Sequence, residues 1–243
     1  MNWKTKLAYV LLLLVGTIFN GPFMTEAADC DSCISCFDKD RSCRQFYLGG
    51  IVGADFATLD KVAGQPTTIP AQSLFTAGGT AGMRFLRDHG ALRLEFEGRG
   101  RDQASVTVGD PATDSITTRA TDGWSAMVNV WRDYKPFENL GVYAGGGIGV
   151  GGYRWTIGGT GLGSNIEGND RISNFAWQAG TGVFYDVSER ATIDLGYRFF
   201  AVNESTAGYT ILGNPVSDIT NFAASELLLT FRIYEPFRSW RDR

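Results

Sequence analysis

The strongest constraint on the fold is a strict alternation of side-chain type in the segment LRLEFEGRGRD, residues 92–102. Leu92, Leu94 and Phe96 share one parity, and charged residues share the other. Successive side chains of a β-strand point to opposite faces of a sheet, so the segment is predicted to be a strand with one apolar and one charged face. A soluble barrel would turn the charged face to water, whereas a membrane barrel would turn it inward.

Glycine shares a face with charge in several of the other alternating segments. In ATIDLGYRFFA (191–201), Ile193 and Leu195 oppose Asp194 and Gly196, and 31 of the 243 residues are glycine. Glycine weakens a strand and gains nothing on a surface that faces water. It does make room for long charged side chains inside a narrow eight-stranded barrel. The charged face is therefore predicted to point inward and the apolar face to meet lipid.

The predicted fold is all-β: a closed, eight-stranded, antiparallel up-and-down transmembrane β-barrel. The eight predicted strands cover roughly 45–56, 73–86, 91–102, 123–134, 141–154, 172–186, 191–201 and 223–234. Four long connections are predicted as extracellular loops, and three short ones as periplasmic turns. The long ones are 57–72, 103–122, 155–171 and 202–222, and the short ones are 87–90, 135–140 and 187–190. Aromatic residues near strand ends, among them Tyr47, Trp124, Tyr134 and Trp155, are predicted to form girdles at the membrane boundary.

Buried charges are tolerated only when they are paired and hydrogen-bonded, and the inward faces carry both signs. The predicted interior charge network consists of Arg84, Arg93, Glu95, Glu97, Arg99, Asp194, Arg198, Glu226 and Arg232.

The N-terminus has the layout of a secretory signal peptide. Lys4 and Lys6 precede an apolar run over 7–19, and Gly21-Pro22 breaks that run. The predicted domain order is a signal peptide at 1–27, a Cys-rich periplasmic segment at 28–44, the barrel at 45–237 and a basic tail at 238–243. The predicted location is the cell outer membrane.

All four cysteines, Cys30, Cys33, Cys36 and Cys43, lie in the segment DCDSCISCFDKDRSC. A ferredoxin-type cluster would continue with C-x3-C-P, whereas here six residues separate the last two cysteines. Two disulfides in an oxidising compartment are favoured over a metal site or reactive thiols, and three pairings remain open. We therefore expect the oxidised mature protein to show no free thiol in a thiol titration and to contain no stoichiometric zinc or iron in a metal analysis. Two titratable thiols with bound metal would contradict this.

Other motifs give no catalytic, cofactor or metal site. Residues 147–152 match G-x-G-x-x-G, but no helix signal follows, as a dinucleotide site would require. The single histidine, His89, lies in a predicted periplasmic turn, and Glu95 and Glu97 alternate with arginine as ion-pair partners. With 22 Lys and Arg against 26 Asp and Glu, the chain has no basic surplus for nucleic acid. No enzymatic activity and no cofactor are predicted.

The predicted strands together resemble the small bacterial outer-membrane barrels. These include the transmembrane domain of outer membrane protein A and the opacity-type surface antigens. The resemblance rests on FYLGGIVGADFA (46–57), TAGGTAGMRF (76–85), LRLEFEGRGR (92–101), GWSAMVNVWRDY (123–134), GVYAGGGIGVGGYR (141–154) and IDLGYRFF (193–200), and it covers about 45–237. It implies recognition of a C-terminal aromatic by the assembly machinery, with Phe231, Tyr234, Phe237 and Trp240 as candidates.

Two non-enzymatic functions fit this fold. The favoured one is a structural or surface-interaction anchor that presents four loops, because eight strands leave little lumen. The alternative is a narrow porin-like channel for small solutes or ions, and a lipid-modifying barrel enzyme is less favoured. The expected partners are outer-membrane lipid, the barrel-assembly machinery and an extracellular ligand at the loops, with the chain acting as a monomer and without nucleic acid.

Overall fold

The computed structural model describes residues 44–59, 72–87, 89–110, 114–161, 164–211 and 213–236, and nearly all of them lie in β-strands. The strands are β1 (Arg44–Leu59), β2 (Gln72–Arg87), β3 (Gly90–Arg101), β4 (Ala104–Asp110), β5 (Asp114–Tyr134), β6 (Leu140–Gly161), β7 (Ser164–Ser188), β8 (Ala191–Ile211) and β9 (Asn214–Tyr234). The described part holds no helix long and apolar enough to cross a membrane. The predicted signal peptide, the four cysteines and the C-terminal tail lie outside the described residues.

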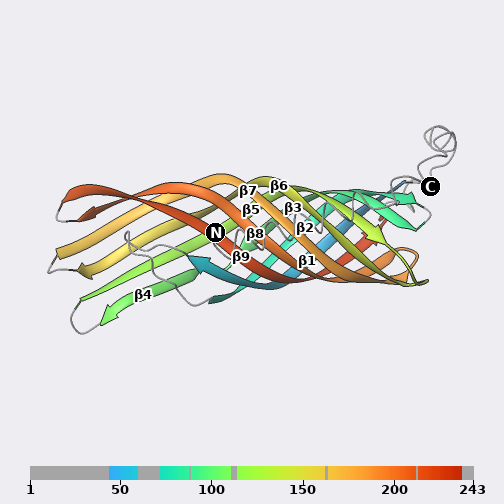
Figure 1. Ribbon diagram of the computed structural model, residues 1–243, viewed down its shortest axis with the longest axis horizontal. Coiled ribbons are helices and arrows are strands. Elements are labelled where there is room, and N and C mark those ends of the chain that lie inside the picture. The colour runs from blue at the N-terminus through green and yellow to red at the C-terminus, as the bar shows by residue number, and fades with distance from the viewer. Residues whose placement is uncertain are drawn as a thin grey trace, which may run out of the picture.

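The strands close into an antiparallel ring of eight (Figure 1). β1 pairs with both β2 and β9, and β3 pairs with both β2 and β5, so no edge remains at this level. β4 continues β3 after a break at Asp102 and Gln103 and pairs with β5 alone. The predicted eight-stranded barrel is confirmed. Closure satisfies the backbone groups that an open edge would leave unpaired in lipid.

An apolar belt surrounds the ring, and the charged faces point inward, as predicted. On β3, Phe96 is 63% exposed while its neighbours Glu95 and Glu97 are 1% and 3% exposed. On β5 the outward side chains from Trp124 to Tyr134, a stretch of 11 residues, are apolar apart from Arg132 near its lower end. Eleven residues at about 3.3 Å each, tilted by about 45°, span roughly 25 Å, the height of the apolar band of outer-membrane barrels.

Three of the four predicted long loops are wrong, because strands fill most of them. Apart from residues 162–163 and 212–213, the segment 155–171 belongs to β6 and β7 and the segment 202–222 to β8 and β9, and most of 103–122 belongs to β4 and β5. Their Gly, Thr, Ser and Asn content suggested loops, but above the membrane water can solvate a polar outer face while strand pairing continues. The hairpins therefore project well beyond the belt at the end that carries β4 (Figure 1). The three short turns lie at the opposite end, as predicted.

The two faces of the wall exchange character at the upper edge of the belt. On β6, the outward side chains change from Val150 below to Arg154 above, while the inward ones become Tyr153, Trp155 and Ile157. The irregularities of pairing at this end lie at or above this edge, near Thr121, Glu167 and Val202. The barrel therefore consists of a lower part with charges inside and an upper part with an apolar interior.

The predicted aromatic girdle is correct for some residues and wrong for others. Trp124, Tyr134 and Tyr185 are exposed on the outer face near the ends of the belt. Tyr47 and Trp155 are buried inside the barrel instead, because their strand parity points inward. Of the C-terminal aromatic candidates, Phe231 faces outward and Tyr234 inward, whereas Phe237 and Trp240 lie outside the described residues.

Candidate functional site

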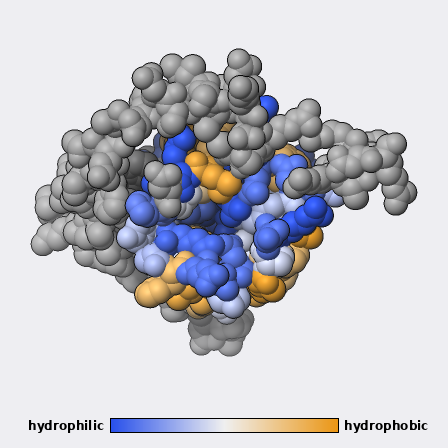
Figure 2. Space-filling view, turned by 90° about the vertical axis from the view of Figure 1, so that its right-hand side faces the viewer, coloured by the Kyte–Doolittle hydropathy of each residue, from blue (hydrophilic) through white to orange (hydrophobic). Residues whose placement is uncertain are grey.

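The candidate site is the polar interior of the lower barrel. Eleven charged residues there are buried, five arginines and six acids: Arg93, Arg99, Arg101, Arg198, Arg232, Asp55, Glu95, Glu97, Asp133, Asp194 and Glu226. Viewed from the end with the short turns, hydrophilic residues gather in the middle and hydrophobic ones lie along the lower rim (Figure 2). The nearly balanced charge is what a buried polar core requires, because an unpaired buried charge is strongly destabilising.

Glu226 on β9 is the acceptor that ties the upper layer of this network together. Its two carboxylate oxygens accept hydrogen bonds from Arg99 Nη1 at 2.7 Å and from Arg101 Nη2 at 2.8 Å. Arg101 Nε also donates to Asp55 Oδ2 at 2.8 Å, and its Nη1 donates to Ser125 Oγ at 3.0 Å. The Arg101 side chain on β3 thus links its own strand to β1, β5 and β9 across the lumen.

Glu97 and two amides form the middle layer. Glu97 lies 2.7 Å from Arg99 Nε and also accepts a hydrogen bond from Arg198. Asn129 Nδ2 donates to Glu97 at 3.1 Å and to Glu95 at 3.2 Å, so it bridges two layers. Gln178 donates to Asn129 Oδ1 at 2.6 Å and accepts from Arg99 Nη2 at 3.0 Å. The amides therefore connect carboxylates that would otherwise repel each other.

Aromatic side chains complete the lower layer. Glu95 accepts hydrogen bonds from Tyr47 Oη at 2.8 Å and Trp131 Nε1 at 3.1 Å. Arg93 Nε donates to Asp133 at 2.9 Å. On the other side of the lumen, Arg232 Nη2 lies 3.0 Å from Asp194 Oδ2, and Tyr143 Oη donates to Asp194 Oδ1 at 3.2 Å. Buried tyrosine and tryptophan are tolerated here because each finds a polar partner.

Glycine gives the aromatic rings room inside the ring of strands. A Cβ atom built on Gly82 would lie 2.8 Å from the Tyr47 ring, and one on Gly182 would lie 2.7 Å from the Tyr143 ring. Both distances are shorter than real carbon contacts, so an alanine at either position would force the ring to move. The glycine on the charged face thus has a packing role at these two positions.

The structure brings eight of the nine predicted network residues together and places the ninth apart. Arg84 lies at the end with the short turns, where it donates to Gln45 Oε1 at 2.6 Å and stacks over Tyr234. The prediction omitted Asp55, Arg101 and Asp133, and also the amides Asn129 and Gln178. Strand parity alone could have found them, since each has the inward parity of its strand.

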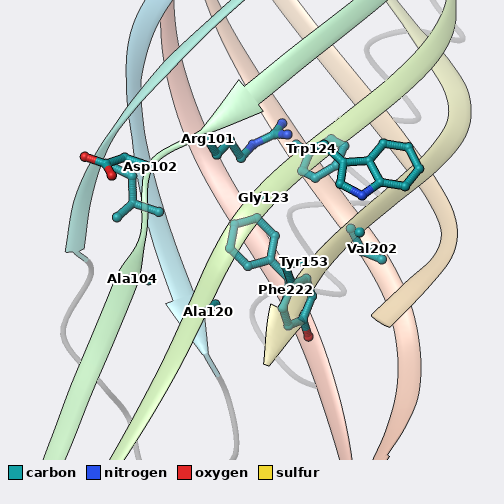
Figure 3. Close-up of a pocket in the computed structure, with 12 residues that line it drawn as sticks. Arg101, Asp102, Ala104, Ala120, Gly123, Trp124, Tyr153, Val202 and Phe222 are labelled. Carbon is teal, nitrogen blue, oxygen red and sulfur yellow. The ribbon is translucent and has the colours of Figure 1, made fainter. Parts of the chain in front are cut away.

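An apolar plug fills the barrel above Arg101. The plug is defined as the buried cluster Ala57, Leu74, Ala104, Ala120, Met127, Tyr153, Trp155, Ile157, Ile166, Ile172, Ala176, Phe200, Val202, Ala207, Tyr209, Phe222 and Ala224. At the boundary the Arg101 guanidinium lies 4.0 Å from the centre of the Phe200 ring. Figure 3 shows Arg101 at one side of a cavity that Tyr153 and Phe222 also line, with Asp102 at the break between β3 and β4. The cavity there has a volume of about 20 Å³, room for about one water molecule.

The described residues offer little for catalysis or metal binding. No group of three or more His, Cys, Asp or Glu side chains among them could hold a metal ion. His89 lies in the exposed turn between β2 and β3, at the end opposite the long hairpins. Gly147–Gly152 lies inside strand β6, which confirms that it is not a dinucleotide loop. Glu95 and Glu97 are both held in the hydrogen-bonded network.

Comparison with solved structures finds other outer-membrane proteins. Neisserial surface protein A matches with a TM-score of 0.41 and 14% identity, over 77% of this chain and 96% of that one. The outer membrane protease OmpT from Escherichia coli matches with a TM-score of 0.44 and 8% identity, over 79% and 95%. OprG from Pseudomonas aeruginosa matches with a TM-score of 0.37 and 10% identity, over 79% and 95%. At these identities and TM-scores the matches do not indicate a function.

The family comparison covers most of the chain. The comparison with curated proteins gives no match. The model of the outer membrane protein β-barrel domain matches residues 33–222, which include seven of the eight strands of the ring and the first part of β9. This match agrees with the closed ring, the apolar belt and the inward charges. The chain therefore belongs to the outer membrane protein β-barrel domain family and has its place in the outer membrane.

Proposed function

We propose that this protein is a non-catalytic, non-conducting surface anchor that presents its long hairpins to a partner outside the cell. The single observation that carries the proposal is the sealed interior. Mid-barrel side chains from different strands, among them Glu226, Asn129 and Trp131, are all 0% exposed to solvent. A continuous water-filled passage would leave such side chains accessible, as in the larger porins.

The upper barrel supports the same proposal. Its apolar plug packs side chains from β4 to β9 with one another, so the projecting hairpins share a core. Trp155 contacts Tyr209, and Tyr153 contacts Phe222, with ring centroids 6.1 and 5.9 Å apart. Hairpins with a shared core are held in fixed relative positions, which lowers the entropic cost of binding a partner at their tips.

Catalysis is left out of the proposal because the groups considered for it, Glu95, Glu97 and His89, are held in the hydrogen-bonded network or lie at the end away from the hairpins. Glu97 is bound by two arginines and two amides, and His89 is exposed at the end away from the hairpins. A general acid or base needs a free proton site within reach of a substrate. The proposed partners are outer-membrane lipid, the barrel-assembly machinery during insertion and an extracellular ligand at the hairpins, with the barrel acting as a monomer.

Electrical recording tests the proposal directly. The purified full chain, inserted into planar bilayers, is expected to show no steady openings in 1 M KCl. A sixteen-stranded porin inserted by the same procedure serves as the control that openings are detectable. Reproducible openings of one size from the folded protein would contradict the anchor and support the narrow channel.

A further inference from the structure

A cluster of three arginines lies on the outer wall just above the belt, on β5, β6 and β7. Arg119 and Arg171 are exposed, and the Arg154 side chain is 37% exposed. Arg154 is paired directly with Arg171 across β6 and β7. Arg119 is paired with Thr156, two residues further along β6, which makes it the diagonal neighbour of Arg154 on the same face. We call these three residues the arginine cluster.

The cluster lies at the height expected for lipid headgroups. Trp124, Gly152 and Ser173 form one outward row across β5, β6 and β7, and Arg154 and Arg171 form the next row above it. One outward step is two residues, about 6–7 Å along a strand, which at a tilt of about 45° is about 5 Å along the membrane normal. The polar headgroup layer on each side of a bilayer is about 5–8 Å thick. Side chains one step above the tryptophan row therefore reach the headgroups of the leaflet on the hairpin side.

The charges of the cluster are poorly compensated within the protein. Like charges directly opposite each other on neighbouring strands are destabilising. Among the described residues, the ion pair to this cluster joins Arg154 Nε and Asp122 Oδ2 at 3.6 Å, and Asp122 is itself 71% exposed. The five buried arginines of the lower barrel differ from this cluster, because each of them has a carboxylate within 3.0 Å. An anion that both opposed arginines can bind would relieve this repulsion.

A phosphate group is such an anion. Guanidinium groups bind phosphate oxygens through two parallel N–H donors, with defined geometry. Two outward steps below the cluster, Val150 and Phe175 are exposed in the belt, so acyl chains attached to the same headgroup would lie against apolar wall. The position thus offers charge for the headgroup and an apolar surface for the chains, which a soluble anion would not use.

We infer that Arg154 and Arg171, with Arg119 beside them, bind the phosphate of a lipid in the leaflet on the hairpin side of the membrane. The inference depends on the orientation of the barrel and not on whether the lumen conducts. Failure of the lipid test would leave the silent bilayer recording untouched, and the reverse also holds. The two results are therefore distinguishable.

The test uses the full chain in phosphatidylcholine nanodiscs with added bisphosphorylated lipid A. Lipid retention is measured by native mass spectrometry. Arg154→Gln/Arg171→Gln is expected to bind lipid A about thirtyfold more weakly than the wild type, since each arginine near a charged membrane surface contributes about a factor of five. Arg190→Gln, in the exposed turn between β7 and β8, is the matched control and should bind like the wild type. Dephosphorylated lipid A should lose the same affinity as the double variant.

Three results would overturn the inference. The first is equal retention of lipid A by the wild type and the double variant, provided that both remain folded by the heat-dependent shift on gels. The second is equal retention of lipid A and its dephosphorylated form by the wild type. The third is binding of soluble polyphosphate as tight as that of lipid A, which would show that the cluster takes a soluble polyanion instead of a lipid.

Discussion

Replacing Glu226 with glutamine is expected to lower the free energy of unfolding by about 3–5 kcal/mol, because two buried arginines each lose one of their two carboxylate partners. Glu226 is 0% exposed and accepts hydrogen bonds from both Arg99 and Arg101. Glutamine keeps the size but offers one acceptor and one amide donor, so at least one arginine faces a donor. Denaturant titration in lipid, followed by tryptophan fluorescence, measures the change.

Two further variants separate the charge effect from a general loss of packing. Glu204→Gln changes an exposed glutamate on β8 and should shift the free energy of unfolding by no more than about 0.5 kcal/mol. Glu226→Gln/Arg99→Gln removes one charge of each sign and keeps the Arg101–Asp55 and Arg198–Glu97 pairs. It should recover about 0.5–3 kcal/mol relative to the sum of the single changes. Strict additivity would contradict the network.

Replacing Leu94 with arginine is expected to cost about 2–4 kcal/mol and to reduce the assembled fraction, because it puts a charge in the middle of the lipid-facing belt. Leu94 points outward and is paired with Met83 and Val130, which are also exposed apolar residues. The free energy of unfolding in liposomes gives the cost, and the heat-dependent shift on gels gives the assembled fraction.

The matched control for Leu94→Arg is Thr206→Arg. Thr206 is exposed on β8 above the belt, where an arginine meets water. This variant should change the free energy of unfolding by less than about 0.5 kcal/mol. Equal effects of the two substitutions would mean that the belt does not lie in lipid.

The lower barrel could be predicted from sequence because its strands alternate with a period of two residues and always place the apolar side chains on the outer face. Along β3, each residue from Arg93 to Arg101 alternates between the inside and the lipid. A one-residue slip would put every charge into lipid, so the register is strongly specified. The inward position of Glu226 between Ser225 and Leu227 follows from the same parity.

The partners within the network could not be predicted in the same way. Asp55 is the acid for Arg101, yet it stands in a strand of glycine and apolar residues, 46 residues away in sequence. Which inward residues meet across the lumen depends on the stagger between strands, and parity does not contain that information. The amides Asn129 and Gln178 were missed because the prediction considered charge alone.

The strands of the upper barrel were not predicted because the Gly, Thr, Ser and Asn content of these segments was weighed more heavily than their two-residue alternation. Tyr153, Trp155 and Ile157 alternate with polar residues, as do Ala207 and Tyr209, and all five are buried. In these segments the apolar parity points inward, opposite to the belt below. The point where the apolar side chains of a strand change from the outer face to the inner face marks where the barrel wall leaves the lipid.

The central claim is that the barrel interior is filled and closed to water, and thiol labelling tests it most directly. Thr80 and Thr230 point inward and are 5% and 2% exposed. Neither side-chain oxygen has a hydrogen-bond partner among the described residues, so cysteine should replace threonine with little disturbance. Their outward neighbours Ala81 and Leu229 provide matched positions on the lipid face.

The four single cysteines are made in a background without the native ones and tested in folded, membrane-inserted protein. Thr80→Cys and Thr230→Cys are expected to resist a small water-soluble methanethiosulfonate until the barrel is unfolded, while Ala81→Cys and Leu229→Cys react with a lipid-phase maleimide. Rapid reaction of Thr230→Cys with the water-soluble reagent in the folded protein would show a hydrated lumen and contradict the account.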